Sequence, residues 1–167
     1  MKRPVHTIIL AGLVAISALA PAFASGGGSG SGGGGGQSAK LSEPMAKAHK
    51  LIDAKQWQAA MAELQEVDAT RDPMWNNLMG YCLRKNDPPD FAASERYYAA
   101  ALAINPKHLP TLEYLGELRL QQGDLAGAEK ELEQLRKATF FKSEEFKDLQ
   151  KAIAQYKSAG NKYVPED

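Results

Sequence analysis

Small residues recur in this chain at a spacing that points to a repeated helix pair, and this spacing constrains the fold more than any other feature. Ala48, Gly80 and Gly116 open three similar segments, 32 and 36 residues apart. A period of about 34 residues is typical of units made of two helices, each of which buries its apolar face only by stacking on its neighbours. The pattern therefore predicts a stack of three helix pairs.

In each segment a second small residue follows the opening one, and a large apolar residue comes four positions after that second residue. Glycine inside a helix costs up to about 1 kcal/mol relative to alanine, so it is favoured only where another helix must approach closely. We expect the second set to meet the first across each pair, and the large residues to fill the space between successive pairs. The second set is Ala60, Ser94 and Ala128, followed by Leu64, Tyr98 and Leu132.

Capping residues place the ends of the predicted helices. Ser42 and Asp72 stand next to prolines in the first turn, and Asp90, Asp124 and Ser143 precede apolar periodic segments. Gly160 is suited to ending a helix. We predict helices at 43–54, 57–69, 73–85, 90–104, 109–121, 125–138 and 143–158.

The chain before these helices has the composition of a targeting segment and a linker. Lys2 and Arg3 precede an apolar stretch, and Ala22-Phe23-Ala24 has the small residues that a signal peptidase requires. Residues 25–36 are glycine and serine throughout, which favours a flexible coil. The predicted organisation is a signal peptide at 1–24, a linker at 25–40, repeats at 43–72, 73–106 and 107–138 within 41–138, a capping helix at 139–160 and a tail at 161–167.

The second and third segments resemble tetratricopeptide repeats. The resemblance is strongest in LEYLGELRLQQGDLAGAEKELEQL, where Leu115-Gly116, Gly123-Asp124-Leu125 and Ala128 keep the register. It covers about residues 43–138 and implies an all-α solenoid, in which a seventh helix covers the apolar end of the stack. The third repeat with its tail is also similar to small exported bacterial repeat proteins that carry a cysteine pair before the last helix. Residues 139–143 contain no cysteine here, so a redox or metal role does not transfer.

Charge and cysteine content exclude several function classes. The chain has 20 basic and 20 acidic residues, and removal of Lys2 and Arg3 with the signal leaves a net charge near −2. No basic stripe suggests nucleic acid, and no basic amphipathic helix suggests a membrane surface after signal cleavage. Cys82 is the only cysteine, and its apolar surroundings predict burial.

No arrangement of residues predicts catalysis or a cofactor. No zinc-protease, phosphate-loop, CxxC or nucleophile-elbow pattern occurs. His49 and His108 are expected on solvated helix surfaces rather than as metal ligands. Glu113 and Glu117 lie one turn apart on a helix that we expect to be half exposed, where they form either a binding wall or a solvated face.

The resemblance implies a concave groove lined by the first helix of each pair, which binds a protein or peptide partner. The family's groove positions are chiefly polar and aromatic here, although Leu78 and Ile52 could equally pack against neighbouring helices. The groove residues that the resemblance assigns are His49 in the first repeat, Asn77, Tyr81, Arg84 and Lys85 in the second, and Glu113, Tyr114, Glu117 and Gln121 in the third.

Two functional hypotheses remain open at this point. The first is a monomeric, non-enzymatic scaffold or adaptor, periplasmic or secreted, that holds a partner segment in the groove. The second is an accessory or assembly factor for an exported enzyme or metal centre, binding a metal through His49, Glu113 or Glu117.

Overall fold

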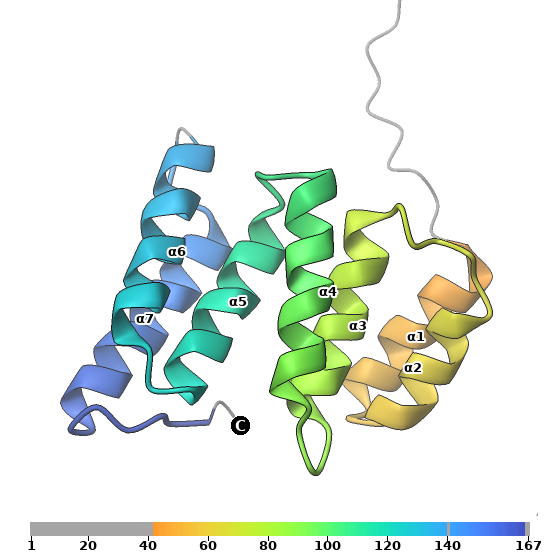
Figure 1. Ribbon diagram of the computed structural model, residues 1–167, viewed down its shortest axis with the longest axis horizontal. Coiled ribbons are helices and arrows are strands. Elements are labelled where there is room, and N and C mark those ends of the chain that lie inside the picture. Colours follow the sequence, from red (N-terminus) through yellow and green to blue (C-terminus); the bar gives the residue numbers. More distant parts are fainter. Residues whose placement is uncertain (1–41, 140, 166–167) are drawn as a thin grey trace, which may run out of the picture. The chain divides into compact units, whose positions relative to one another are not determined.

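The computed structural model describes residues 42–139 and 141–165, all of which belong to one compact unit, Ala39–Asp167. The predicted signal peptide (1–24) and linker (25–40) lie outside the described residues, as do Phe140 and the last two residues of the tail. The described part contains seven α-helices and no strand (Figure 1). They are α1 (Glu43–Asp53), α2 (Trp57–Gln65), α3 (Pro73–Lys85), α4 (Phe91–Ile104), α5 (Leu109–Gln121), α6 (Leu125–Ala138) and α7 (Glu144–Ser158).

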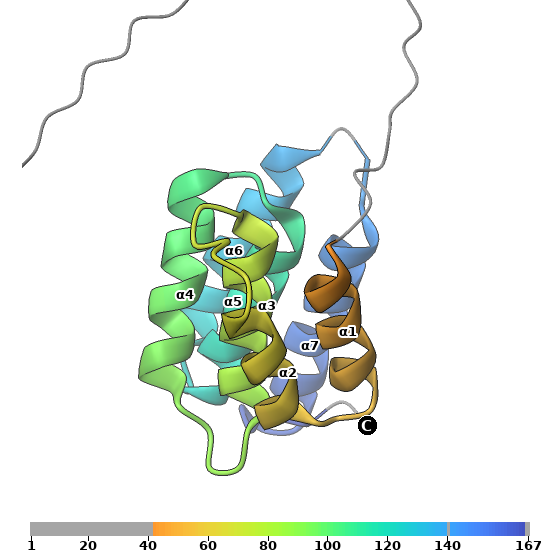
Figure 2. The same ribbon diagram turned by 90° about the vertical axis from the view of Figure 1, so that its right-hand side faces the viewer.

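The helices pack as three consecutive pairs with an additional last helix, which confirms the predicted all-α solenoid. α1 packs on α2, α3 on α4 and α5 on α6, and α7 packs against both α5 and α6. Between pairs, α2 contacts α3, α4 contacts α5, and α3 contacts α5. In Figure 2, α1 and α7 lie on one side, α4 lies on the opposite side, and α3 and α5 lie between them.

Close contact within a pair is visible at Gly80. A Cβ atom at this position would lie 2.6 Å from Cε1 of Tyr98 and 3.2 Å from the backbone oxygen of Ser94. The Ser94 hydroxyl donates a buried hydrogen bond to the Gly80 carbonyl oxygen at 2.8 Å. Only glycine permits this approach, so the predicted contact of small residues is confirmed in this pair. At Gly116 the nearest side chain is instead Leu149 of α7.

Three apolar clusters form the core, one over α1–α3, one over α4 and α5, and one over α5–α7. Leu64 and Tyr98 are fully buried, as the repeat pattern predicts, whereas Leu132 is half-buried against the α5–α7 cluster. Leu78 is also part of the core, and Ile52 packs against the first cluster, so both act as packing residues.

The helix ends follow the predicted capping chemistry with two exceptions. The side chains of Asp72, Asp90, Asp124 and Ser143 each accept a backbone N–H at the start of α3, α4, α6 and α7. The Ser42 side chain forms no capping hydrogen bond, so that part of the prediction is wrong.

The predicted helix at 57–69 is also too long, because α2 ends at Gln65. Near this end, the Leu64 carbonyl oxygen accepts the indole N–H of Trp75 at 2.7 Å. A side chain of α3 thus occupies a carbonyl oxygen of the last turn of α2. Across the described ranges, every helix is too short or too polar to cross a lipid bilayer.

Candidate functional site

Three aromatic side chains from successive helix pairs form a continuous series, called here the aromatic row: Trp57, Tyr81 and Tyr114. The Tyr81 ring lies edge-on to Trp57, with centroids 5.8 Å apart, and tilted against Tyr114, with centroids 4.7 Å apart. All three side chains are half-buried. Trp57 begins α2, whereas Tyr81 and Tyr114 belong to α3 and α5, so the row crosses all three helix pairs.

The guanidinium group of Arg84 lies behind the row and is buried. Its Cζ atom is 5.4 Å from the centroid of Tyr81 and 5.6 Å from that of Tyr114. Its Nη1 atom lies 2.5 Å from Oε2 of Glu117, with both side chains almost inaccessible. Burial lowers the pKa of Arg84, but the interactions with Tyr98 and Glu117 raise it by more, so the guanidinium group stays ionised.

The contact between Arg84 and Glu117 depends on charge more than on hydrogen-bond geometry. Within the described residues, none of the three guanidinium nitrogens has a well-aligned hydrogen bond. Guanidinium groups attract the faces of aromatic rings, so Arg84 also fixes the positions of Tyr81 and Tyr114. The aromatic row is therefore held from behind by a buried ion pair.

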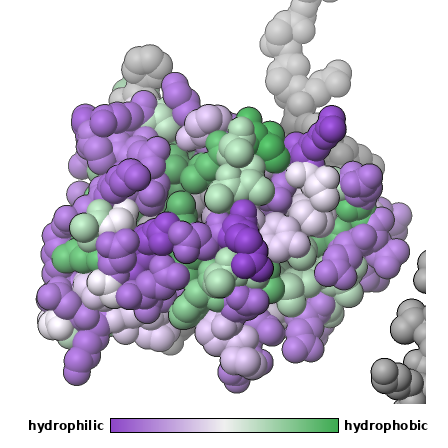
Figure 3. All heavy atoms as spheres, viewed as in Figure 1, coloured by the Kyte–Doolittle hydropathy of each residue, from purple (hydrophilic) through white to green (hydrophobic). Residues whose placement is uncertain are grey.

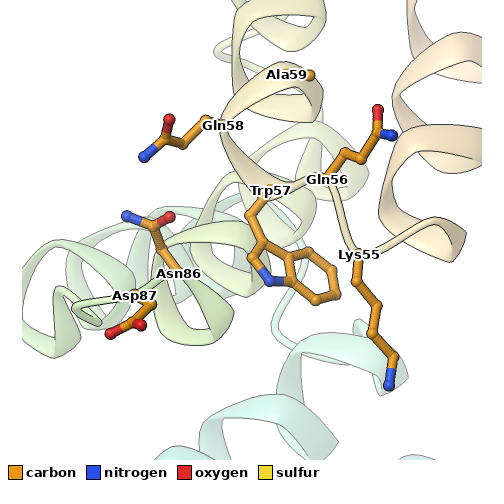
Figure 4. A pocket seen from close by; sticks show the side chains of 7 residues that line it. All are labelled: Lys55, Gln56, Trp57, Gln58, Ala59, Asn86 and Asp87. Atoms are coloured by element: carbon orange, nitrogen blue, oxygen red, sulfur yellow. The ribbon is translucent and has the colours of Figure 1, made fainter.

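A surface hollow of about 440 Å³ adjoins the row at Trp57. Figure 4 shows the Trp57 indole between Lys55 and Gln56 on one side and Asn86 and Asp87 on the other. Further along the row, the Lys85 ammonium lies 5.9 Å from the Tyr81 centroid. The half-buried part of the site thus combines aromatic rings with cationic and polar groups.

Four of the nine predicted groove residues lie below the surface: Asn77, Arg84, Glu113 and Glu117. The expectation that α5 is half exposed at Glu113 and Glu117 is therefore wrong, because α3 and α7 both pack against it. The amide oxygen of Asn77 accepts the Thr111 hydroxyl at 2.9 Å. These residues support the site from within.

Burial has a chemical consequence at Glu113. It raises the pKa of the Glu113 carboxyl group to about 8, and the charges of Glu117, Asp148 and Glu145 act in the same direction. The carboxyl group is therefore largely protonated at neutral pH and adds little negative charge to the site. Burial also raises the pKa values of Tyr81 and Tyr114, which keeps both phenols neutral.

The other five predicted residues, Tyr81, Lys85, Tyr114, Gln121 and His49, are half-buried. Tyr81, Tyr114 and Lys85 lie together, whereas no contact joins His49 on α1 to them among the contacts that the structure gives. Gln121 ends α5, and its buried Oε1 atom accepts no hydrogen bond from the described residues. Tyr81, Tyr114 and Lys85 are thus the predicted residues that the structure brings together near the surface.

The histidines do not both behave as solvated side chains. His108 precedes α5, and its Nδ1 atom is 2.7 Å from the Thr111 hydroxyl oxygen, which corrects the expectation for this residue. Burial lowers the pKa of His108. In residues 42–139 and 141–165 no three His, Cys, Asp or Glu side chains form a potential metal cluster.

Cys82 is buried as predicted, and burial raises the pKa of its thiol to about 12. A thiol with so high a pKa is a poor nucleophile at neutral pH. Its role in the described structure is to pack between helices.

Two residues near the site were missed by the sequence prediction, Trp57 and Tyr163. Trp57 occupies the repeat position that Phe91 and Leu125 fill in the later pairs, and both of those pack on core clusters. Its repeat position therefore indicates packing, and only the contact with Tyr81 reveals a second role. Tyr163 lies beyond the last helix, where no periodicity or repeat register predicts a contact.

The rest of the surface carries few large hydrophobic groups. In the view of Figure 3, hydrophilic residues cover much of the face and hydrophobic residues form smaller groups among them. The exposed large hydrophobic residues of the described part are Ile104, Phe141 and Val164. They belong to three different segments of the chain.

Comparison with known proteins identifies the repeat. Residues 90–153 match the family model of the tetratricopeptide repeat. The match begins at the residue that caps α4 and extends through α5 and α6 into α7. No curated protein and no solved structure matches the chain. The match covers less than half of the chain, and together with the stacked helix pairs it supports a tetratricopeptide repeat fold.

Proposed function

We propose that the chain is a non-enzymatic scaffold or adaptor of the bacterial periplasm, which binds a segment of a partner protein along the aromatic row. Tetratricopeptide repeats generally bind proteins, which supports the interaction role. The observation that carries the proposal is the Tyr81–Tyr114 contact, because two half-buried rings on neighbouring repeats lie 4.7 Å apart beside a cationic side chain.

The chemistry of the row suits protein recognition. Aromatic residues contribute large contact areas with few rotatable bonds, and interface hot spots are rich in Tyr and Trp. Arg84 is held by Glu117 and by both tyrosine rings, so the row needs little reordering when a partner binds. Preorganisation of this kind reduces the entropic cost of association.

The location is inferred from residues 1–24, whose basic start, apolar stretch and Ala22-Phe23-Ala24 sequence are those of a secretory signal. Cleavage after Ala24 would release the repeat unit behind its Gly/Ser segment. We infer a monomer, and sedimentation at two protein concentrations tests this directly.

A capture experiment tests the function. The Ala39–Asp167 unit is used as bait in periplasmic and cytoplasmic extracts of the source organism, beside a Tyr81→Ala/Lys85→Ala form. The matched control is Phe141→Ala/Arg96→Ala, which removes an exposed aromatic ring and an exposed cation outside the row. Arg84 is left unchanged, because its buried pair supports the fold.

The expected result is a periplasmic protein captured by the native and control baits and lost from the Tyr81→Ala/Lys85→Ala bait, with equal helicity in circular dichroism. The same proteins on all three baits, or none on any, would overturn the proposal. The identity of the captured protein separates a general scaffold from an assembly factor for an exported enzyme or metal centre.

A further inference from the structure

The first helices of the second and third pairs lie side by side with a fixed offset along the chain. The Tyr81 ring of α3 packs on the Tyr114 ring of α5, and Arg84 of α3 pairs with Glu117 of α5. The partners in both contacts are 33 residues apart. Because both contacts advance along the two helices together, α3 and α5 run in the same direction.

The last helix repeats this arrangement against α5. A Cβ atom at Gly116 would lie 2.5 Å from Cδ2 of Leu149, and one at Gly123 would lie 3.9 Å from the Tyr156 hydroxyl oxygen. These partners are also 33 residues apart. α7 therefore runs beside α5 in the direction and register that α5 has beside α3, and it takes the place of a further first helix in the stack (Figure 1).

This register brings acidic side chains of α7 to Glu113. Glu113 lies one turn before Gly116, Glu145 lies one turn before Leu149, and Asp148 directly precedes Leu149. Residues one turn apart share a face of a helix, so Glu145 and Asp148 meet α5 at the level of Glu113. Glu113 is only 9% exposed, and Glu145 is half-buried. The contact between α5 and α7 thus encloses a carboxyl group among other carboxyl groups.

The buried cation nearby does not balance this group. Arg84 pairs with Glu117 on the same helix as Glu113, and none of the ion pairs among the described residues includes Glu113. Burial, together with the charges of Glu117, Asp148 and Glu145, raises the pKa of Glu113 to about 8. The geometry of the contact therefore explains why this carboxyl group holds its proton near neutral pH.

The other titratable groups around α5 do not take over this role. The phenols of α3, α4 and α5 have raised pKa values and stay neutral: Tyr81, Tyr98 and Tyr114. Burial lowers the pKa of His108, so its imidazole is neutral above pH 6.5. On α6, Glu131 accepts the Gln134 amide at 2.6 Å and lies near the charges of Lys130 and Arg119. Glu113 is thus the group of this contact that changes charge above neutral pH.

α7 is placed so that it can open without the rest of the stack. It is the last helix, and its main contacts are with α5 and α6. Terminal elements with few neighbours open at a lower free energy than the whole domain. α7 covers Leu112 and Leu120 of α5 and Leu135 of α6 in the α5–α7 cluster, so its opening would expose an apolar face.

We propose that α7 is a pH-dependent cap on the stack, which stays closed while Glu113 carries a proton and opens more often once Glu113 is ionised. An ionised Glu113 adds a carboxylate beside Glu117 and opposite Glu145 and Asp148, and the opening of α7 returns these groups to water. The surface that opens is the one on which a further helix pair would stack. The cap acts at the end of the stack, so it does not depend on the aromatic row.

The size of the effect follows from the linkage between protonation and opening. In the closed state the pKa of Glu113 is about 8, and in the open state it returns towards the ordinary value of 4.5. The closed state therefore binds more protons, and the opening equilibrium constant rises by up to tenfold per pH unit between these values. Between pH 6 and pH 9 the rise is at most about 100-fold.

Hydrogen–deuterium exchange measured by mass spectrometry tests the proposal. Peptides from α7 and α3 of the Ala39–Asp167 unit are compared at pH 6 and pH 9, after correction for intrinsic exchange rates. The variants are Glu113→Gln and, as the exposed control, Glu133→Gln. We expect the protection of α7 to fall by about tenfold to 100-fold more than that of α3 in the native and control forms. In Glu113→Gln the two helices should respond alike.

A second variant tests the geometry of the contact. Glu145→Gln/Asp148→Asn keeps Glu113 but removes the charges that face it from α7, so the loss of α7 protection at pH 9 should be smaller than in the native form. An unchanged loss in this variant would overturn the proposal. An equal loss in α3 and α7 of the native form, which indicates global unfolding, or an α7 response that survives Glu113→Gln, would also overturn it.

Discussion

Arg84 on α3 and Glu117 on α5 form an ion pair between two neighbouring repeats, with 2.5 Å between Nη1 and Oε2 and almost no solvent access to either side chain. The pair lies directly behind Tyr81 and Tyr114, whose rings are within 6 Å of the guanidinium carbon. A charge on each repeat thus sets the spacing of the two aromatic rings on the surface. On the same two helices, buried residues support the site and half-buried residues form its surface.

Removal of one member of this pair is expected to destabilise the fold strongly. Arg84→Met leaves the Glu117 carboxylate buried without its partner, which costs about 3–5 kcal/mol in comparable sites. The double variant Arg84→Met/Glu117→Leu removes both charges and should recover most of the loss. Urea unfolding followed by circular dichroism measures the three free energies of unfolding. If the Arg84→Met variant were as stable as the native chain, the ion pair would not support the fold.

The two glycines of the first helices should respond differently to alanine. In Gly80→Ala the new Cβ meets the rigid ring of Tyr98 and the Ser94 backbone, whereas in Gly116→Ala it meets the side chain of Leu149, 2.5 Å from Cδ2. Overpacking costs typically 1–3 kcal/mol, and a leucine end relaxes more easily than a fixed ring. We expect Gly80→Ala to lose about 1–2 kcal/mol more than Gly116→Ala in urea unfolding. The reverse order would contradict the packing described at Tyr98.

Stability should fall between acid and mildly alkaline pH because of Glu113. Its pKa is raised to about 8 in the folded state, above the ordinary value of 4.5, so the folded chain binds more protons than the unfolded chain between these values. The free energy of unfolding therefore decreases as the pH rises from 4.5 through 8, by at most about 5 kcal/mol. Glu113→Gln should remove this decrease and be more stable than the native chain at pH 9.

The control for this measurement is Glu133→Gln, since the exposed Glu133 pairs with Arg136 on the surface. Differences between each variant and the native chain at pH 5, 7 and 9 cancel the contributions of the histidines. A Glu113→Gln profile parallel to the native profile would mean that this carboxyl group is ionised in the folded chain.

Two helix starts with similar sequence signals should differ in their contribution to stability. The Asp124 side chain accepts the Gly127 N–H at 2.8 Å, whereas the Ser42 side chain caps nothing. Replacement of a working N-cap by alanine costs about 1 kcal/mol. We expect that loss for Asp124→Ala and a change within about 0.5 kcal/mol for Ser42→Ala, both measured by thermal unfolding. Equal losses would indicate that Ser42 caps α1 in solution.

Local patterns predicted the helices well because their causes are local. The caps at Asp90 and Asp124 depend on residues within one turn, and the periodicity of each helix depends on residues within a few turns. The end of α2 was missed because it depends on the Trp75 indole, which comes from the next helix. The buried state of Glu117 was missed for the same reason, since its partner Arg84 is on another repeat.

The candidate site was predicted only in part. The family register placed Tyr81, Tyr114 and Lys85 on one face, which the described contacts support. It could not reveal that Trp57 joins them, because the equivalent residues Phe91 and Leu125 pack in the core. Contacts made by a tail such as that of Tyr163 have no periodic signal at all.

The central claim is that a partner segment lies along the aromatic row, and amide chemical shifts of the Ala39–Asp167 unit test it most directly. The unit, labelled with nitrogen-15, is titrated with the captured partner or its binding segment. We expect shift changes concentrated at Tyr81, Lys85, Tyr114 and the start of α2, with α4 and α6 little affected. Changes concentrated on α4 and α6, or at the ends of the stack, would contradict it.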